Sequence, residues 1–332
     1  IMKALVTGGG GFLGRYIVEQ LLARGDEVTV FARGAYPELV ELGAKQIRGD
    51  LQHRDDVVKA CAGLDAVFHV AAKAGYWGTW ESFYRPNVIG AENIIAGCRE
   101  QGVGKLIFTS TPSVVANNQS RVGANESLPY PATYESYYPQ TKAIAEQLVT
   151  KANGDVLLTV SLRPHIVYGP RDTHIIPRLV DRARAGKLIQ VGDGTNKIDV
   201  TYVEDAARAH LLAADALEPG SAVAGSVYFI SQDQPVALWP WVNDLLRRLD
   251  VPPVTKKIPL SLARTLGGAM EFAYRTFKLK GEPRLTRFLA NELALSHYYD
   301  ISRAKQDFGY QPQVTMEESV QRTVAYFKQI GM

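Results

Sequence analysis

The stretch Lys3-Ala4-Leu5-Val6-Thr7-Gly8-Gly9-Gly10-Gly11-Phe12-Leu13-Gly14 decides the fold of this chain. An apolar run ends in glycines, and apolar residues then recur at helical spacing from Leu13 to Leu22. The pattern predicts a strand, a tight turn and a helix. Gly8, Gly11 and Gly14 stand three residues apart. In a dinucleotide-binding turn the first such glycine allows the bend, the second lets a pyrophosphate approach, and the third lets the helix pack on the strand.

The start of that helix predicts an anion site. Its first turn holds Phe12 and Leu13, and backbone N–H groups at this position have no partner within a helix. The positive end of the helix dipole also favours a phosphate. The alternative is a plain glycine-rich loop, because such turns are common. The strand before the turn and the helix after it favour a dinucleotide site.

The composition is that of an ordinary globular protein. The chain has 332 residues, of which 46% are hydrophobic and 21% charged, and its net charge is +3. That charge is too small to indicate a nucleic-acid partner or an anionic membrane, and no apolar run is long enough for stable membrane insertion. Cys61 and Cys98 lack metal-ligand spacing, so we expect buried thiols and a reducing, cytoplasmic compartment.

Strands alternate with helical patterns over the first half of the chain. The alternation predicts an α/β protein with a doubly wound, parallel Rossmann sheet. Past Gly169 the chain has more prolines and irregular turns, and we expect helices there without intervening strands. After the first strand, the expected strands are 27–32, 46–48, 65–70, 105–109, 156–162 and 227–230.

This change in composition and local pattern predicts that the chain folds into two parts. We expect residues 2–170 to form the dinucleotide-binding core, which the chain re-enters near 195–232. We expect residues 171–194 and 233–332 to form a smaller, C-terminal substrate lobe that covers the reactive end of the cofactor. The boundary between the core and the lobe therefore does not lie at a single position in the chain.

The end of the second strand indicates which dinucleotide binds. A carboxylate at this point normally binds the ribose hydroxyls of NAD, whereas an arginine accommodates the 2′-phosphate of NADP. The chain has Arg33 and no acid there, which favours NADP(H) over NAD(H). A solvent-facing arginine beside an NAD site is the alternative. Asp50 and Leu51 follow the third strand, where a carboxylate can reach the adenine, unless Asp50 only caps its turn.

Tyr138 and Lys142 are the candidate catalytic pair. They lie four residues apart in the helical stretch 138–149, so they share one helix face. We expect the lysine ammonium to lower the pKa of the phenol, which then exchanges a proton with a substrate oxygen. The lysine can also hold the nicotinamide ribose. Tyr274 and Lys278 have the same spacing, but they lie in the late lobe and we expect no catalytic role for them.

These motifs together resemble an extended short-chain dehydrogenase/reductase along nearly the whole chain. The resemblance implies that Ala71, Ala72, Lys73 and Pro164 lie beside the cofactor. It also aligns Thr111 with the catalytic serine or threonine, within a hydroxyl cluster that includes Thr109 and in which Ser113 can share the role. After the glycine turn and the Tyr/Lys pair, the matching stretches are 68–72, 87–90, 109–113, 162–170, 192–194 and 202–205.

Within this superfamily, residues 71–78 and 109–114 resemble the 3β-hydroxysteroid dehydrogenase-like branch. More narrowly, they resemble bacterial reductases of 2-alkyl-3-oxoalkanoic acids in olefin biosynthesis, and residues 285–289 and 307–310 continue the likeness. The resemblance implies NADPH-dependent reduction of the keto group of a long-chain β-keto acid, hence a small hydrophobic keto or hydroxy substrate. The alternatives are a sterol dehydrogenase, a nucleotide-sugar epimerase or dehydratase, and a non-catalytic NADP-sensing protein.

The late lobe suggests how a hydrophobic substrate is held. Residues 260–279 have the pattern of an amphipathic helix, which packs on its own lobe, covers an alkyl-chain tunnel or makes transient contact with a membrane. Tyr76, Trp77 and Trp80 are candidates to line the same pocket. Arg287 is a candidate partner for a substrate carboxylate.

Two histidines, His165 and His174, follow the sixth strand and are expected to border the site. No metal-binding triad is visible in the sequence, so we expect no metal. Related proteins often pair through a face built from the helices that contain Asn87 and Tyr138, so a homodimer is expected by analogy.

Overall fold

Seven parallel strands form the main sheet of the computed structural model, which describes residues 1–332. The chain runs outward from β1 through β2 to β3 and then returns to β4 on the other side of β1, which confirms the doubly wound sheet. The strand order is β12-β7-β5-β4-β1-β2-β3. Their bounds are β1 (Lys3–Thr7), β2 (Glu27–Ala32), β3 (Lys45–Arg48), β4 (Ala66–His69), β5 (Lys105–Thr109), β7 (Leu158–Pro164) and β12 (Val227–Ile230).

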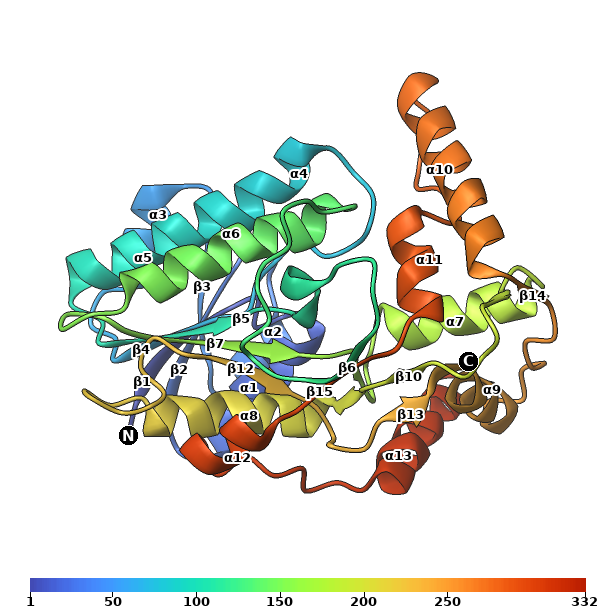
Figure 1. Ribbon diagram of the computed structural model, residues 1–332. Coiled ribbons are helices and arrows are strands. Elements are labelled where there is room, and N and C mark those ends of the chain that lie inside the picture. The colour runs from blue at the N-terminus through green and yellow to red at the C-terminus, as the bar shows by residue number, and fades with distance from the viewer.

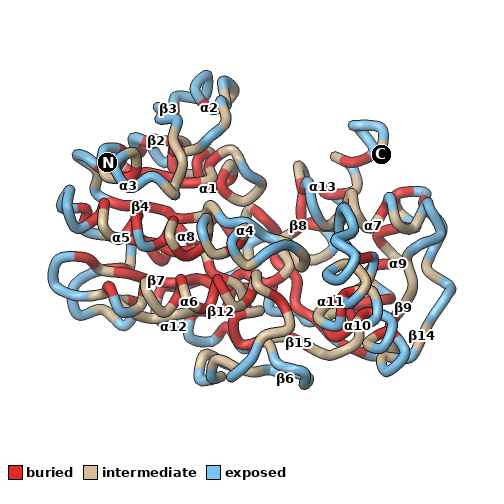
Figure 2. The backbone as a smooth tube through the Cα atoms, turned by 90° about the horizontal axis from the view of Figure 1, so that it is seen from above, coloured by how far each residue is buried: buried red, intermediate tan, exposed pale blue.

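Helices cover both faces of this sheet (Figure 1). Helices α1 (Phe12–Ala23) and α8 (Val203–Ala216) pack together on one face, and α3 (Arg54–Ala60), α5 (Gly90–Gln101) and α6 (Tyr137–Ala152) pack on the other. The buried residues of Figure 2 run along the strands between these two layers. Cys61 and Cys98 are buried free thiols, as expected. The shorter helices beside the sheet are α2 (Pro37–Glu41), α4 (Trp80–Tyr84) and α12 (Ser302–Phe308).

The expectation that the late lobe has helices without intervening strands is wrong. A second sheet has the order β13-β10-β15-β6, and two strand pairs, β11-β8 and β14-β9, lie beside it. Most of these strands are two residues long, which is too short for an alternating pattern to be readable. Their bounds are β6 (Arg121–Ala124), β8 (Val167–Tyr168), β9 (Gln190–Val191), β10 (Lys197–Ile198), β11 (Thr201–Tyr202), β13 (Val236–Ala237), β14 (Lys257–Ile258) and β15 (His297–Tyr299).

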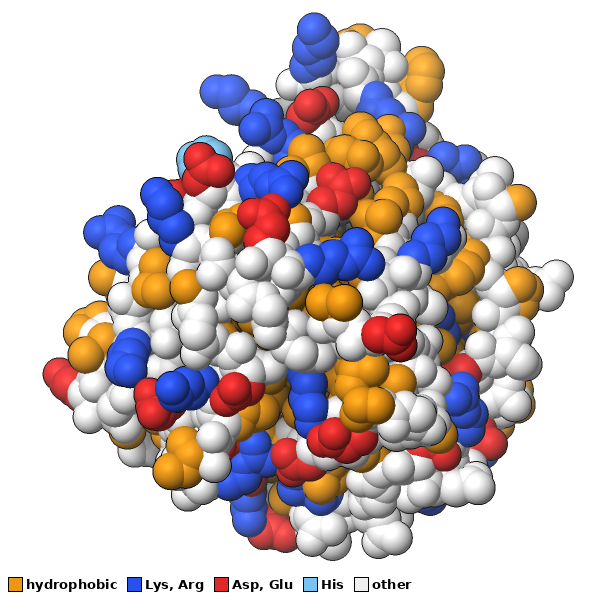
Figure 3. Space-filling view, turned by 90° about the vertical axis from the view of Figure 1, so that its left-hand side faces the viewer, with side chains coloured by type: hydrophobic (Ala, Val, Ile, Leu, Met, Phe, Trp, Pro, Cys, Tyr) orange, Lys and Arg blue, Asp and Glu red, His pale blue; other side chains and the backbone are white.

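Three helices of this region are built around a separate apolar cluster that includes Trp239, Ile198 and Phe327, and two others pack together at a smaller one that includes Ala263 and Ala290. None of the chain's helices combines the length and apolar composition that a membrane span requires. Positive and negative side chains are interspersed on the face shown in Figure 3. The helix bounds are α7 (Ile175–Arg184), α9 (Leu238–Arg248), α10 (Leu260–Thr276), α11 (Arg287–Ala294) and α13 (Met316–Gln329).

Helix α10 stands out from the body of the molecule (Figure 1). It ends at Thr276 rather than at residue 279, and Lys278 has a φ of +50°, outside the helix. Tyr274 and Lys278 therefore do not share a helix face, unlike Tyr138 and Lys142 within α6. A sequence spacing shared by two pairs thus corresponds to two different geometries.

Candidate active site

One cleft of about 1840 Å³ runs along the carboxyl ends of the main sheet, where ligands bind in open α/β sheets. It is bordered by the glycine turn, by the end of β5, by α6 and by segments of the late lobe. Every candidate residue of the sequence analysis for catalysis or cofactor binding lines it, namely Gly8, Gly11, Phe12, Leu13, Gly14, Arg33, Asp50, Leu51, Ala71, Ala72, Lys73, Thr109, Thr111, Ser113, Tyr138, Lys142 and Pro164.

The glycine turn leaves no room for side chains. Gly8 has a φ of +69°, and a Cβ there would lie 2.9 Å from the backbone of Ala71. A Cβ on Gly14 would lie 2.1 Å from the carbonyl oxygen of Gly8. The N–H of Gly11 donates to that same oxygen at 2.8 Å. The turn therefore presents only backbone atoms at the start of α1, and its shape fits a pyrophosphate.

Two arginines lie close together at the ends of β2 and β3. Arg33 is exposed and forms no ion pair, and its carbonyl oxygen accepts from the Nε of Arg48 at 3.3 Å. Tyr36, which the sequence analysis missed, lies so close to the turn that a Cβ on Gly10 would meet its ring at 2.1 Å. Asp50 accepts from the backbone N–H of Gln52 at 3.0 Å and so caps its own turn.

Asn87 holds the loop that follows β4. Its Oδ1 accepts from the N–H of Lys73 at 2.7 Å, and its Nδ2 donates to the carbonyl of Lys73 and to the hydroxyl of Thr141. It lies in a π-helical turn, Arg85–Ile89, rather than at a simple helix start. Such turns are frequent at functional sites. Through Asn87, this one joins the loop after β4 to α6.

The hydroxyls and the ammonium of the candidate catalytic group lie at the end of β5. Lys142 donates from Nζ to the carbonyl oxygen of Thr109 at 2.6 Å and lies 4.0 Å above the ring of Phe108. The hydroxyls of Thr111 and Ser113 are 3.1 Å apart. Tyr138 is partly buried beside Thr111, whose hydroxyl favours the phenolate. The structure thus brings all four side chains to one place.

The expected lowering of the Tyr138 pKa is not present in this structure. Burial raises the pKa of Tyr138 to about 12, against the opposing effect of Thr111. Burial also lowers the pKa of Lys142 to about 7, although the carboxylate of Glu146 opposes it. Loss of hydration disfavours the charged form of both groups. Burial and the charge of Lys142 lower the pKa of nearby His69 to about 3, so this imidazole is neutral.

Glu146 also fixes the position of α6, and sequence reasoning missed it. Its carboxylate accepts from Arg163 of β7 at 2.9 Å and 2.5 Å, and both side chains are buried. The Tyr130 hydroxyl donates to the same carboxylate at 2.6 Å. Bidentate pairs of this kind are strong and directional. The pair therefore sets the register of the helix that holds Tyr138 and Lys142.

Only one of the three aromatic residues that were expected to line the substrate pocket does so. Tyr76 lines the cleft, but Trp77 packs on Tyr274, and Trp80 packs on Tyr84 and Tyr137. The rings of Trp77 and Trp80 pack on other aromatic rings and do not line the cleft. A single sequence does not reveal such pairings.

Arg287 is not a free cation. Its Nε and Nη2 donate to one carboxylate oxygen of Glu271 at 3.0 Å and 2.9 Å, and its backbone N–H donates to the other at 2.7 Å. The hypothesis that it binds a substrate carboxylate is therefore wrong. Helices α10 and α11 are joined by this ion pair instead.

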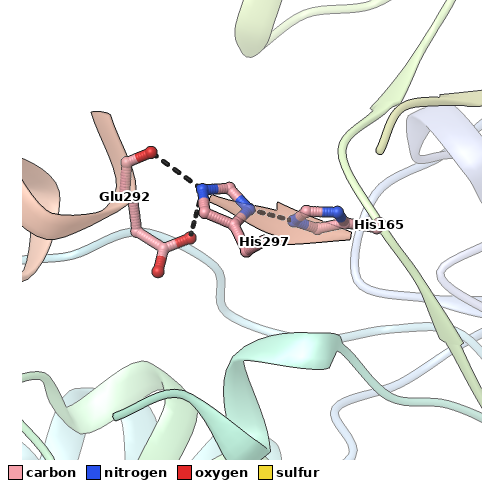
Figure 4. Close-up of side chains that lie close together, drawn as sticks. All are labelled: His165, Glu292 and His297. Atoms are coloured by element: carbon pink, nitrogen blue, oxygen red, sulfur yellow. Dashed lines mark hydrogen bonds and ion pairs between the residues drawn. The ribbon is translucent and has the colours of Figure 1, made fainter. Parts of the chain in front are cut away.

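His174 and His165 both line the cleft, and His165 has partners that the sequence did not suggest. Figure 4 shows Glu292, His297 and His165 in a row, from α11, β15 and the end of β7. His297 Nδ1 lies 3.1 Å from His165 Nε2, and His297 Nε2 lies 2.8 Å from the carbonyl oxygen of Glu292. One potential metal-ligating atom from each residue falls within a 4.8 Å group.

Comparison with known proteins agrees with this geometry. Residues 5–262 match the 3-beta hydroxysteroid dehydrogenase/isomerase family. A 2-alkyl-3-oxoalkanoate reductase of Stenotrophomonas maltophilia is 49% identical over 98% of this chain and 99% of its own length. The mouse decarboxylating sterol-4-alpha-carboxylate 3-dehydrogenase is 37% identical over 98% of this chain and 91% of its own length.

A solved structure extends the likeness to three dimensions. The UDP-glucose 4-epimerase of Thermus thermophilus, determined as a complex with NAD, superposes with a TM-score of 0.74. It is 28% identical and covers 98% of this chain and 99% of its own. The similarity in fold therefore spans the sheet and the late lobe together.

The buried ammonium of Lys142 predicts how stability depends on pH. Its pKa is about 7 in the folded chain, below the ordinary value of 10.5, so between these pH values the unfolded chain binds a proton that the folded chain does not. The free energy of unfolding should rise with pH in this window, by roughly 2 kcal/mol between pH 7 and pH 9. Urea unfolding of Lys142→Met should lack this rise. The control Lys256→Met, at an exposed lysine, should follow the parent protein; parallel profiles for the parent and Lys142→Met would contradict the assignment.

Proposed function

The chain belongs to the 3-beta hydroxysteroid dehydrogenase/isomerase family, and from this premise we propose that it interconverts a ketone and a secondary alcohol with NADP(H) on a hydrophobic substrate. It is an oxidoreductase that acts on a CH–OH or C=O group and uses a nicotinamide cofactor. The observation that carries the proposal is that Tyr138, Lys142 and Thr111 line the same cleft as the glycine turn.

The names of the relatives support a substrate class. In a 2-alkyl-3-oxoalkanoate the reacting carbon is C3 and the carboxylate is attached to C2. In a sterol-4-alpha-carboxylate that is oxidised at C3, the carboxylate is attached to C4. Both substrates have a carboxylate on the carbon next to the reacting one. We infer that this chain acts on a long-chain 2-alkyl-3-oxoalkanoic acid and its 3-hydroxy acid, with a sterol acid as the alternative.

The cleft supports binding of the cofactor through four groups of residues. The bare turn at Gly8, Gly11 and Gly14 would take the pyrophosphate, and Arg33 would take the 2′-phosphate. Phe12 and Leu13 begin α1, and Pro164 ends β7 near the reactive end. When bound, NADPH would supply the hydride.

The chain's own residues would handle the proton. Tyr138 would donate its phenolic proton to the substrate oxygen as negative charge develops there, because a phenol with a high pKa is protonated at neutral pH. The Thr111 hydroxyl would hold that oxygen, with Ser113 as its hydrogen-bonded neighbour. Lys142, held by the Thr109 carbonyl, would stabilise the resulting phenolate. Closure of the cleft by the late lobe would exclude water.

Further parts of the proposal concern the organisation of the chain. We infer that residues 171–194 and 233–332 form the substrate lobe, since α7, α9 and α13 surround an apolar cluster distinct from those of the main sheet. Helix α12 is an exception within these bounds, because Ala304 and Phe308 pack in the core of the main sheet. A homodimer through α5 and α6, transient membrane contact of α10 and a cytoplasmic location stay predictions.

The substrate class is tested by comparing three kinds of compound. Net oxidation of NADPH should be fastest with a long-chain 2-alkyl-3-oxoalkanoic acid, slower with a 3-ketosteroid and absent with nucleotide sugars. The chain has Arg33, not an acid, at the second-strand position, and an epimerase would convert a nucleotide sugar with no net consumption of NADPH. Such a conversion would overturn the proposal, and binding of NADPH without reduction of any ketone would indicate a sensing protein.

The role of Tyr138 is tested by removing its hydroxyl. Tyr138→Phe should lower kcat by roughly 10²- to 10⁴-fold, the usual contribution of a positioned acid, while NADPH affinity stays within about threefold. Tyr274 lies on α10 and is followed by Lys278 at the same sequence spacing. The control Tyr274→Phe should leave both quantities unchanged. Steady-state rates and fluorescence titration with NADPH measure the two effects. Comparable turnover of Tyr138→Phe and the parent protein would defeat the assignment.

The preference for NADP(H) is tested at Arg33. Arg33→Gln should raise the KM for NADPH roughly 10- to 100-fold, since a hydrogen-bonded charge contributes about 1.5–3 kcal/mol. The KM for NADH should not rise, because NADH lacks the 2′-phosphate. Equal losses with both coenzymes would show that Arg33 does not read the phosphate.

A further inference from the structure

A buried polar cluster forms the inner end of the cleft, beside the end of β7. It consists of Arg121 on β6, His165, Glu292 and His297, and all four line the cleft. Strands β6 and β15 are parallel neighbours, with Arg121 paired to His297. Residues at the same register of adjacent strands point to the same face of a sheet. The two side chains therefore face His165 together.

The hydrogen bonds of the two imidazoles leave one nitrogen unused. A carbonyl oxygen only accepts, so His297 Nε2 carries the proton that is donated to Glu292. In the matching tautomer, His297 Nδ1 accepts from the N–H of His165 at Nε2. The remaining nitrogen of His165, Nδ1, is buried and has no partner. Burial lowers the pKa of His165 well below its usual value, and His297 and Arg121 lower it further.

Arg121 therefore holds the positive charge of the cluster, and its guanidinium is incompletely paired. The side chain is 5% exposed, and its Nη2 lies 3.3 Å from one carboxylate oxygen of Glu292. Its Nε and Nη1 are buried without a partner. Buried guanidinium groups are normally satisfied by carboxylates. Arg163 donates two hydrogen bonds to Glu146 and leaves only Nη1 without a partner, whereas Arg121 leaves two of its three nitrogens without one. An unsatisfied donor pair beside a cleft indicates a site made for an anion.

A bound metal ion fits this cluster poorly. The nitrogens that face each other in His165 and His297 are joined by a hydrogen bond, and the three potential ligands lie in a row instead of around a point (Figure 4). The guanidinium of Arg121 adds a positive charge beside the same carboxylate. Metal ligands converge on the ion and present free lone pairs to it.

We propose that Arg121 binds the carboxylate of the substrate, next to the carbon that is reduced. The inference rests on the proposed function, because it requires a substrate with a carboxylate on the carbon next to the reacting one, as in a 2-alkyl-3-oxoalkanoic acid. His165 follows β7, and Thr111 follows the adjacent strand β5. Adjacent strands are about 4.8 Å apart, and the charge of Arg121 is close enough to act on His165. A carboxylate at Arg121 and a keto oxygen at Thr111 can therefore be attached to nearby carbons of one substrate. The cluster then selects β-keto and β-hydroxy acids over simple ketones.

The experiment uses the oxidation direction, because 3-hydroxy acids are chemically stable. The intact protein is assayed with NADP⁺ and two substrates, a long-chain 2-alkyl-3-hydroxyalkanoic acid and its primary amide, which has the same shape without the charge. The parent protein should prefer the acid. Arg121→Gln should lower kcat/KM for the acid roughly 10- to 100-fold, mainly through KM, and leave the amide within about threefold.

Controls separate this role from a structural one. Arg121→Lys, which keeps the charge without the planar fork, should recover part of the loss. Arg184→Gln, at an exposed arginine outside the cleft, should behave as the parent protein, and NADP⁺ affinity should be unchanged in every variant. If Arg121→Gln does not fold, the preference of the parent protein for the acid over the amide decides the question.

The outcomes distinguish this inference from the proposed function. Equal use of acid and amide by the parent protein would overturn the carboxylate site and leave the ketone/alcohol chemistry standing. Turnover of neither compound would remove the proposed function and this site with it. Loss of activity after dialysis against EDTA, restored by Zn²⁺, would overturn the anion site in favour of a metal at His165, His297 and Glu292.

Discussion

A single buried carboxylate, that of Glu146, holds in place the helix on which the candidate catalytic residues Tyr138 and Lys142 lie. It joins α6 to β7 through Arg163 and accepts a third hydrogen bond from Tyr130. Both members of the ion pair are buried, so removing either would leave an uncompensated charge in the core. Because Lys142 lies one helical turn before Glu146, the same carboxylate also offsets part of the cost of burying its ammonium. Position and electrostatics of the candidate site therefore depend on one interaction.

The cleft combines apolar burial with a few fixed charges. Near the end of β5, loss of hydration disfavours charge on both Tyr138 and Lys142, and it keeps His69 neutral. The guanidinium groups that line the cleft include Arg33, which follows β2, and Arg121 on β6. In the two proposals, Arg33 meets the 2′-phosphate of the cofactor and Arg121 meets the carboxylate of the substrate. Guanidinium groups suit both anions because they are planar, always charged and able to donate two parallel hydrogen bonds.

Several side chains acquired their roles only through partners far away in the chain. Arg287 is paired with Glu271, and Trp77 with Tyr274, so both are removed from the substrate site. Asn87 was recognisable as part of a motif, but its hydrogen bonds to Lys73 and Thr141 depend on the π-helical turn in which it lies. Such contacts have no local signature, because sequence periodicity reports which face is buried and not which residue is opposite.

The sequence by itself determined the strand–turn–helix at Gly8 to Gly14, the seven strands of the parallel sheet and the pairing of Tyr138 with Lys142 along one helix. These features follow from local rules, since glycine spacing, strand composition and helical period act over a few residues. Only the tertiary structure decided that the buried Arg121 keeps two unpartnered nitrogens, that the pKa of Tyr138 is raised, and that Arg121, His165 and His297 line one cleft. Charge and hydration depend on distance in space, and the short strands β6 and β15 bring together residues more than 170 positions apart.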